Sequence, residues 1–196
     1  MNALVYLHGF RSSPKSTKAR LLGDFLARHA PEIEYIVPAL DARPAQAMSQ
    51  VLWHCLAKAP GQLTLVGSSL GGFYATVAAE KLGCRAVLLN PVVKPRDALA
   101  AQLGTQRNLY TGEPFELTRA HLDELGALAV AAITRPERYW LIAETGDELL
   151  DWRGMAAFFA SCRQTIVEGG SHMLDSFASH LDGIAAFAGA APGGRA

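Results

Sequence analysis

Residues 63–80 read LTLVGSSLGGFYATVAAE, and the pattern within them decides the fold. An apolar run, Leu63–Val66, is followed by Gly-Ser-Ser-Leu-Gly and then by small residues typical of a buried helix. This is a G-x-S-x-G motif between a strand and a helix, where a sharp turn exposes the central serine. The residues two positions before and after this serine must have very small side chains. Only the register centred on Ser69 places glycines, Gly67 and Gly71, at both positions. We therefore predict that Ser69 is a nucleophile at a strand-to-helix turn.

Other glycine-rich motifs fit this stretch less well. A Walker phosphate-binding loop ends in Gly-Lys-Ser or Gly-Lys-Thr, whereas this one ends in Gly71-Gly72-Phe73. The dinucleotide-binding fingerprint G-x-G-x-x-G needs a glycine two residues after Gly67, where Ser69 stands. The alternative that remains is a tight turn without chemistry, and the rest of the chain has to decide between the two.

Length and composition favour one soluble domain that spans residues 1–196. The 18 basic and 18 acidic residues balance, so no excess of charge attracts nucleic acid or an anionic membrane. The first residues, MNALVYLHGF, contain neither a basic leader nor an apolar run long enough to span a membrane. Three scattered cysteines predict reduced thiols rather than a disulfide framework or a zinc site. We therefore expect a cytoplasmic monomer or small homo-oligomer that binds neither nucleic acid nor membranes.

Short apolar runs alternate with amphipathic segments, which is typical of an α/β protein whose parallel sheet is covered by helices on both faces. We predict six mostly parallel strands, at Leu4–Leu7, Ile33–Val37, Leu63–Val66, Ala86–Leu89, Tyr139–Ala143 and Thr165–Val167. A long insert, residues 92–138, separates the fourth strand from the fifth. Its pattern predicts a helix at Pro95–Leu103, a loop at Gly104–Leu117 and a helix at Thr118–Ile133. Such an insert commonly forms a cap over a site, and the alternative is a helical decoration away from it. The tail, residues 190–196, is expected to fray.

A serine hydroxyl attacks a carbonyl efficiently only when a base takes its proton and a carboxylate orients that base. On a sheet of this kind the groups follow the order serine, acid, histidine, each in a loop beyond the carboxyl end of a strand. His172 comes directly after the last predicted strand and follows two glycines, whereas His180 lies within the last predicted helix. We therefore predict His172 as the base.

The acid is expected in the loop after the strand at Tyr139–Ala143. Asp147 follows Gly146 in the turn itself, and we predict it as the acid. Three neighbouring carboxylates compete with it, and two near the histidine are weaker alternatives: Glu144, Glu148 and Asp151, then Glu168 and Asp175. Of these, Asp151 stands where the N-cap of a helix would explain it without chemistry.

The tetrahedral intermediate of acyl transfer needs hydrogen-bond donors for its oxyanion. One predicted donor is the backbone N–H of Leu70, which follows Ser69 and lies at a helix N-terminus. The other is the N–H of Phe10, in the loop after the first strand, where the His8 side chain is expected to brace the loop rather than to transfer protons. Arg11 follows, and if it faces the pocket it is a candidate for binding an anionic group of the substrate.

Longer strings of sequence are similar to those of a known family. They are YLHGF-SSP-S-KA at Tyr6–Phe10, Ser12–Pro14, Ser16 and Lys18-Ala19; LVGSSLGG-YAT at Leu65–Gly72 and Tyr74–Thr76; NP at Asn90-Pro91; YTG at Tyr110–Gly112; TGDE-LD at Thr145–Glu148 and Leu150-Asp151; and ASCRQT-EGG-H at Ala160–Thr165, Glu168–Gly170 and His172. On these strings the chain resembles the YqiA-like esterases, small bacterial α/β-hydrolases, almost from end to end. Only the tail after about Ala188 lies outside the resemblance.

The resemblance implies a minimal α/β-hydrolase fold and an esterase whose catalytic triad is Ser69, Asp147 and His172. It implies carboxylic ester substrates, with acyl thioesters such as acyl-CoA as a further class. We expect no metal or organic cofactor. Family members have Asn where this chain has Ser171, a change beside the base that leaves the histidine in place. Two alternatives stay open: an acyltransferase that uses the same acyl-enzyme, and a ligand-binding protein on this fold without turnover.

Overall fold

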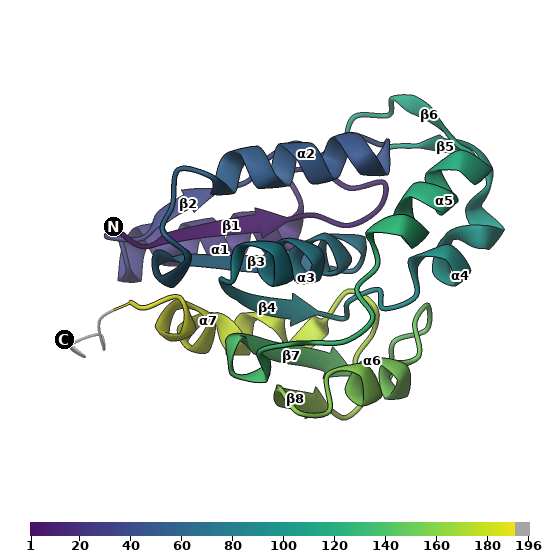
Figure 1. Cartoon of the computed structure of the whole chain (residues 1–196). Helices are drawn as coiled ribbons and strands as arrows, with labels where there is room; N and C mark the ends of the chain where they lie inside the picture. The colour runs from purple at the N-terminus through teal and green to yellow at the C-terminus, as the bar shows by residue number, and fades with distance from the viewer. Residues whose placement is uncertain (191–196) are drawn as a thin grey trace.

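A six-stranded parallel sheet forms the centre of the computed structural model, which describes residues 1–190 (Figure 1). The strand order is β2-β1-β3-β4-β7-β8, and every neighbouring pair is parallel. The strands are β1 Ala3–Leu7, β2 Glu34–Ile36, β3 Leu63–Ser68, β4 Arg85–Leu89, β7 Tyr139–Glu144 and β8 Arg163–Val167. The predicted α/β fold with six parallel strands is therefore confirmed. The tail that was expected to fray lies outside the described residues, except for Ala190.

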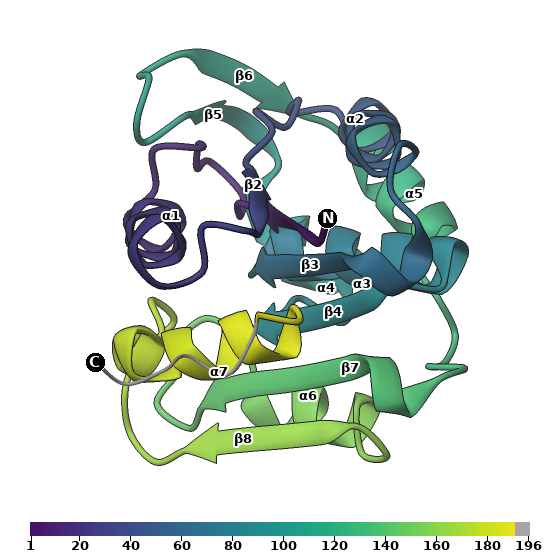
Figure 2. The same cartoon turned by 90° about the vertical axis from the view of Figure 1, so that its left-hand side faces the viewer.

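Both faces of the sheet are buried, because successive side chains of a strand point to opposite faces. In β1, Ala3, Val5 and Leu7 pack into one apolar cluster, and Leu4 and Tyr6 pack into the other. Helices α2, α3 and α6 contribute to the first cluster, and α1 and α7 contribute to the second (Figure 2). These helices are α1 Thr17–His29, α2 Pro44–Cys55, α3 Leu70–Leu82, α6 Trp152–Phe158 and α7 Leu181–Phe187. Burial on both faces explains why the four inner strands, β1, β3, β4 and β7, are mostly apolar, whereas the edge strands β2 and β8 are only partly buried.

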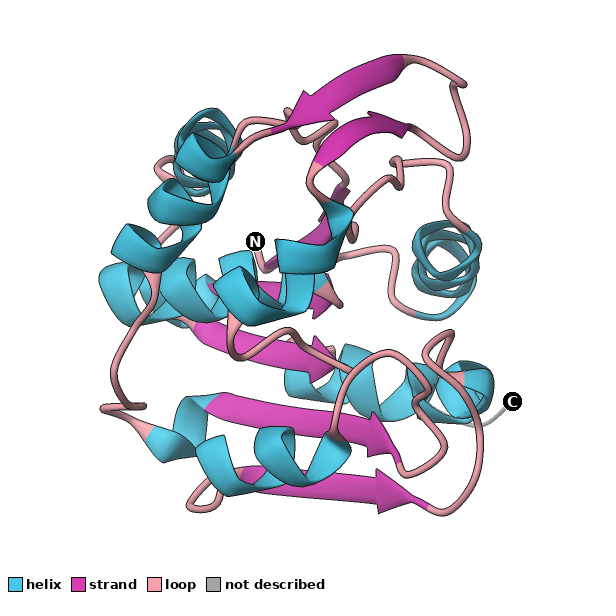
Figure 3. Cartoon of the chain, turned by 90° about the vertical axis from the view of Figure 1, so that its right-hand side faces the viewer, coloured by secondary structure: helices cyan, strands magenta, loops and turns pink. Residues whose placement is uncertain are grey.

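The middle of the insert corrects one prediction. Residues 104–117, expected as a loop, form an antiparallel hairpin of β5 Gly104–Arg107 and β6 Pro114–Leu117, which Figure 3 shows apart from the main sheet. Both strands are only four residues long. β5 has no bulky apolar residue and β6 has two, Phe115 and Leu117, so no apolar run marked them in the sequence. The Asn108 side chain closes the turn by accepting hydrogen bonds from two N–H groups within it.

The helices of the insert are shorter than predicted. The first is α4 Pro95–Leu99, which continues as a 3₁₀ turn at Ala100–Gln102, and the second is α5 Arg119–Leu128. Thr118 is the N-cap of α5 rather than its first residue. The remaining 3₁₀ helices are Pro60–Gln62, Pro136–Arg138 and Asp175–His180, and the last of these replaces the start of the predicted final helix. Within residues 1–190, no helix has both the length and the apolar character needed to cross a membrane.

The turn after β3 brings α3 into close contact with the sheet. A Cβ atom on Gly67 would lie 2.3 Å from the carbonyl oxygen of Gly71, and a Cβ atom on Gly71 would lie 2.0 Å from that of Leu7. Both obstacles are backbone atoms, which cannot rotate away as a side chain can. The two outer glycines of the motif are therefore required by packing.

The loop after β1 is fastened by the buried side chain of His8. Its Nε2 atom accepts a hydrogen bond from the N–H of Leu40 (3.1 Å), so the ring proton is on Nδ1, which donates to the carbonyl of Gly9 (3.1 Å). Burial lowers the pKa of His8, and the hydrogen bond to Gly9 only partly offsets this effect. A neutral ring that bridges two backbone groups acts as a brace.

We expect Gly71→Ala to lower the free energy of unfolding by about 3 kcal/mol or more, because the new methyl group overlaps the Leu7 carbonyl. Urea denaturation measures the effect. Gly154→Ala is the control, since Gly154 is an exposed residue of α6 with nothing within 4 Å of the added atom. The control should gain about 0.5–1 kcal/mol, as alanine usually does over glycine in a helix. Equal stability of Gly71→Ala and the wild type would show that the turn is looser than described.

We expect the protein to lose stability as the pH falls below about 6.5, with part of this loss due to His8. The unfolded chain binds a proton at His8 in this range, whereas the folded chain, whose His8 pKa is lowered, does not. Stability therefore rises with pH between the folded and unfolded pKa values. His8→Gln keeps a neutral donor and acceptor, so its unfolding free energy should depend less on pH between 5 and 7 when both proteins are titrated with urea. An identical pH dependence in both proteins would contradict this role of His8.

Candidate active site

Ser69 occupies the turn between β3 and α3 in a backbone conformation that is rare for residues other than glycine. Its φ is 55° and its ψ is −119°. Four backbone hydrogen bonds hold it there: its N–H donates to the carbonyl of Leu89 (3.0 Å), and its carbonyl accepts from the N–H groups of Val92 (3.0 Å), Gly72 (2.9 Å) and Phe73 (3.3 Å). Strain of this kind persists only where the surroundings over-determine the conformation. The serine side chain is partly exposed.

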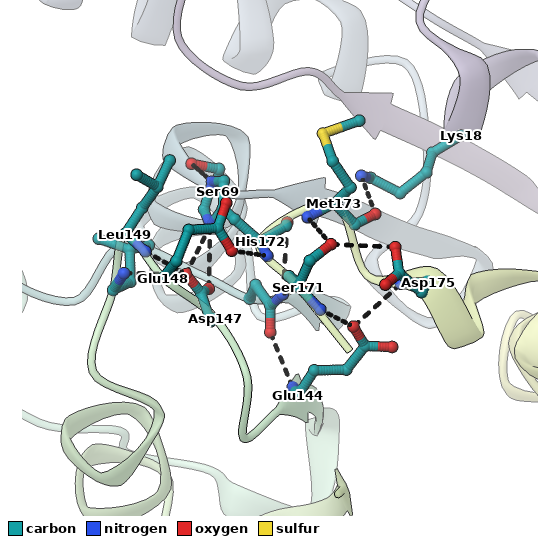
Figure 4. A network of polar contacts seen from close by, with 12 residues as sticks. Lys18, Ser69, Glu144, Asp147, Glu148, Leu149, Ser171, His172, Met173 and Asp175 are labelled. Atoms are coloured by element: carbon teal, nitrogen blue, oxygen red, sulfur yellow. Dashed lines mark hydrogen bonds and ion pairs between the residues drawn. The ribbon is translucent and has the colours of Figure 1, made fainter. Parts of the chain in front are cut away.

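The imidazole of His172 lies between Ser69 and Asp147 (Figure 4). Its Nε2 atom is 3.0 Å from Ser69 Oγ, and its Nδ1 atom is 2.8 Å from Asp147 Oδ2 and 3.0 Å from Oδ1. An ionised carboxylate only accepts hydrogen bonds, so the Nδ1 proton points at Asp147 and Nε2 is free to accept from the serine hydroxyl. The three side chains therefore form one hydrogen-bonded chain that ends at the serine oxygen.

Asp147 is shielded from solvent and held from its own loop. Its side chain is 0% exposed, whereas that of His172 is 14% exposed. Asp147 Oδ1 also accepts hydrogen bonds from the N–H groups of Leu149 and Leu150, each at 2.9 Å. These bonds fix the carboxylate in the orientation that faces the histidine ring.

The other candidate carboxylates have different contacts. Glu148 accepts from the backbone N–H of His172 (2.8 Å), and Asp151 accepts from the N–H of Arg153 as the N-cap of α6. Asp175 accepts from the hydroxyl of Ser171. Glu168 is exposed, and Glu144 contacts the histidine loop through backbone groups only.

Glu144, the last residue of β7, is the functional candidate that the sequence left undervalued. It is 1% exposed, and its carboxylate accepts three backbone N–H groups, from Ser171 (2.7 Å), Asp175 (2.9 Å) and Ser176 (2.7 Å). Burial alone would raise the pKa of Glu144, but the hydrogen bonds from Ser176, Ser171 and Asp175 outweigh it and hold this pKa below its ordinary value. The available signal was an acidic residue that directly continues a buried strand.

The two predicted oxyanion donors come from two segments that meet at Ser69. Leu70 is the first residue of α3, where a backbone N–H has no partner within the helix and the helix dipole favours negative charge. Phe10 lies in the β1 loop, and Gly9 of this loop approaches so closely that an added Cβ would be 3.2 Å from Ser69 Cβ. Within residues 1–190, neither N–H donates a hydrogen bond to another residue. Both donors are therefore available to a ligand.

A cavity of about 550 Å³ opens beside these donors. Its walls are His8–Ser12, Leu40–Arg43, Leu70, Tyr74, Asn108, Glu113–Glu116 and His121. They come from the β1 loop, the segment before α2, the start of α3, the hairpin and α5. Arg11 therefore lines the cavity, together with other acidic and basic residues.

Three hydrogen bonds fasten the hairpin to the β1 loop. Arg11 accepts at its carbonyl from Leu109 N–H (2.8 Å) and donates from Nε to the carbonyl of Arg107 (3.0 Å). Asn108 Nδ2 donates to the carbonyl of Ser12 (2.8 Å). Part of the predicted cap therefore forms a wall of the cavity. In the part of the chain that the structure describes, no three His, Cys, Asp or Glu side chains are grouped to hold a metal ion.

Solved structures with a similar fold include proteins described as hydrolases and esterases. A candidate hydrolase from Agrobacterium vitis S4 matches with a TM-score of 0.75 at 20% identity, over 95% of this chain and 87% of that one. Est1E from Butyrivibrio proteoclasticus, with bound ferulic acid, gives a TM-score of 0.70 at 12% identity, over 95% and 88%. The esterase domain of a Rhodothermus marinus protein gives 0.68 at 18% identity, over 95% and 86%. At these identities the likeness establishes the α/β-hydrolase fold.

The amino-acid sequence identifies the family to which the chain belongs. The model of the uncharacterised protein family UPF0227 matches residues 3–189, which is nearly the whole chain. This is the family that the strings around the serine, the acid and the histidine indicated. The protein is therefore an α/β-hydrolase-fold member of UPF0227, the YqiA-like family.

Proposed function

We propose that the protein is a serine esterase that cleaves carboxylic esters, with acyl thioesters as a further substrate class. The observation that carries the proposal is the His172 ring, with Nε2 3.0 Å from Ser69 Oγ and Nδ1 2.8 Å from Asp147 Oδ2. A serine, an imidazole and a carboxylate joined in this order recur as an acyl-transfer triad on unrelated folds. The esterases among the structures of the same fold support the proposal by analogy.

In the proposed reaction, Ser69 Oγ attacks the carbonyl carbon while His172 Nε2 takes its proton. Asp147 stabilises the resulting imidazolium through Nδ1–H. The N–H groups of Phe10 and Leu70 hold the oxyanion of the tetrahedral intermediate. His172 then returns its proton to the leaving alcohol or thiol, which departs and leaves Ser69 acylated. A water molecule, deprotonated by the same nitrogen, then attacks the acyl carbonyl, and His172 passes this proton to Ser69 Oγ as the carboxylic acid departs.

The cavity suits the acyl part of the substrate better than the leaving group. The tetrahedral carbon carries Ser69 Oγ, the oxyanion, the leaving group and the acyl chain. The leaving group has to face His172 Nε2 to receive its proton. The cavity lies beside Phe10 and Leu70, and no residue of the Asp147 or His172 loops lines it. The acyl chain is therefore directed into the cavity, where the charged side chains disfavour a long, purely aliphatic chain.

We expect Ser69→Ala to lower kcat for p-nitrophenyl acetate by roughly 10⁴–10⁶-fold, because the attacking oxygen is removed. The same variant should fail to react with a fluorophosphonate probe that labels the wild-type protein. Ser68→Ala is the matched control, since Ser68 is the neighbouring serine in the rejected register, and it should still be labelled. Near-normal turnover by Ser69→Ala, or wild-type protein that neither labels nor hydrolyses any ester, would refute the proposal.

We expect Arg11→Ala to raise KM roughly 3- to 10-fold for esters with an anionic acyl group, because a cation is lost from the cavity wall. Arg43, the other cation of the wall, is already paired with Asp41 at 2.8 Å. A neutral ester of matched size is the control, since Arg11 also bonds to the hairpin and its loss can disturb any substrate. Equal rises in KM for both esters would assign Arg11 a purely structural role.

A further inference from the structure

The burial of Glu144 needs a reason beyond the packing of β7. A carboxylate that is taken out of water without partners is strongly unfavourable, and Glu144 is 1% exposed. Its compensation consists of the three backbone N–H groups of Ser171, Asp175 and Ser176, at 2.7–2.9 Å. All three belong to one short segment, residues 171–176, whose second residue is the proposed base. The carboxylate therefore accepts hydrogen bonds from both ends of the loop that carries His172.

The geometry around Glu144 leaves it little freedom. Gly170 has a φ of +73°, and a Cβ atom there would lie 1.9 Å from Glu144 Oε2. The glycine before the loop thus makes room for the carboxylate, which Figure 4 shows beneath the loop with its dashed contacts to Ser171 and Asp175. A different residue at position 170 would push against the group that holds the loop.

Three further side chains tie the same loop to the rest of the fold, and one of them is Glu148, which accepts from the backbone N–H of His172 (2.8 Å). Asn90, after β4, accepts from the backbone N–H of Glu144 (3.0 Å) and donates to the carbonyls of Ser171 (3.0 Å) and His172 (3.3 Å). Lys18, from α1, donates to the carbonyl of Met173 (2.7 Å) and is itself buried. Glu144 thus accepts from N–H groups of the loop, while Asn90 and Lys18 donate to its carbonyl groups. Together these hydrogen bonds restrict the backbone conformation of the loop.

We propose that Glu144 is a positioning residue, whose ionised carboxylate holds residues 171–176 so that the His172 ring reaches Asp147 and Ser69 together. This inference rests on the proposed function for its kinetic consequence, but not for the tether itself. The charge matters because both carboxylate oxygens act only as acceptors. Oε1 takes Ser176 N–H, and Oε2 takes the other two. In Glu144→Gln an –NH₂ group has to replace one oxygen. This donor then faces a backbone N–H of the loop, which is also a donor, although the shape of the side chain hardly changes.

The first test is hydrogen–deuterium exchange of the full chain, which needs no substrate. In Glu144→Gln, peptides that cover residues 169–177 should exchange at least about tenfold faster, while the strands keep their protection. Glu168→Gln is the matched control, because Glu168 is exposed, makes no side-chain hydrogen bond within the described residues and undergoes the same chemical change. Unchanged protection of residues 169–177 in Glu144→Gln would overturn the tether.

The second test is a double-mutant cycle with His172→Ala, read with an activated ester. Glu144→Gln should lower kcat roughly 10- to 100-fold with little change in KM, as expected when a reacting group is displaced by about 1 Å. In the His172→Ala background the same substitution should change the residual rate less than about twofold, because the group through which it acts is gone. An equal loss in both backgrounds would show a general structural role instead.

A second variant keeps the proposal testable if Glu144→Gln does not fold. Gly170→Ala leaves the carboxylate charged but displaces it, so it should reproduce both the faster exchange and the kinetic pattern. Normal exchange and kcat in a folded Gly170→Ala protein would contradict the proposal. The outcomes also separate the two hypotheses: a wild-type protein without esterase activity would refute the proposed function, whereas the exchange data would still decide whether Glu144 holds the loop.

Discussion

The close approach of α3 to the sheet is the constraint on which the rest of the site depends. Gly67 and Gly71 lie so near backbone atoms that neither tolerates a side chain, and Ser69 between them is held at a φ of 55°. The strained turn carries the serine oxygen away from the helix and leaves the Leu70 N–H without an intrahelical partner. One packing contact thus presents the predicted nucleophile and one of its predicted oxyanion donors together.

The end of β7 uses two carboxylates for two opposite purposes. Asp147 points its oxygens at an imidazole N–H, where a charge can appear during a reaction, and its own loop keeps it oriented. Glu144 points its oxygens at backbone N–H groups that never titrate. The same side-chain chemistry therefore provides an electrostatic partner in one case and a mechanical support in the other. Asn90 joins this support to the end of β4, close to the backbone contacts that fix Ser69.

Much of the fold could be read from the sequence because its signals are local. Apolar runs of four to six residues mark strands that are buried on both faces, and the glycine spacing around Ser69 sets the register of the turn. The order of Ser69, Asp147 and His172 along the chain also matches the order that accompanies a G-x-S-x-G turn on an α/β-hydrolase sheet. These features do not depend on knowing which distant segments touch.

The hairpin and the role of Glu144 were missed for physical reasons. The hairpin strands are only four residues long and half exposed, and Phe115 and Leu117 are their only bulky apolar residues, so the hydrophobic pattern is too short to identify a strand. Glu144 appeared as one acid among several competitors, because its partners are backbone N–H groups about 30 residues away and any residue type can supply them. A carboxylate that binds backbone leaves no complementary side chain in the sequence.

The attachment of the hairpin to the β1 loop has a consequence for how this scaffold can diversify. The hairpin lines the cavity, and the same segment holds Arg11 and Ser12, immediately beyond Phe10, through one backbone hydrogen bond and two between side chain and backbone. Under the proposed function, substrate selectivity and catalytic rate would therefore not be independent traits of this molecule. A change of hairpin that admitted a new acyl group would also alter the loop that carries Phe10, the proposed oxyanion donor. Single substitutions on the cavity wall should consequently change the substrate range more readily than insertions into the hairpin or its exchange.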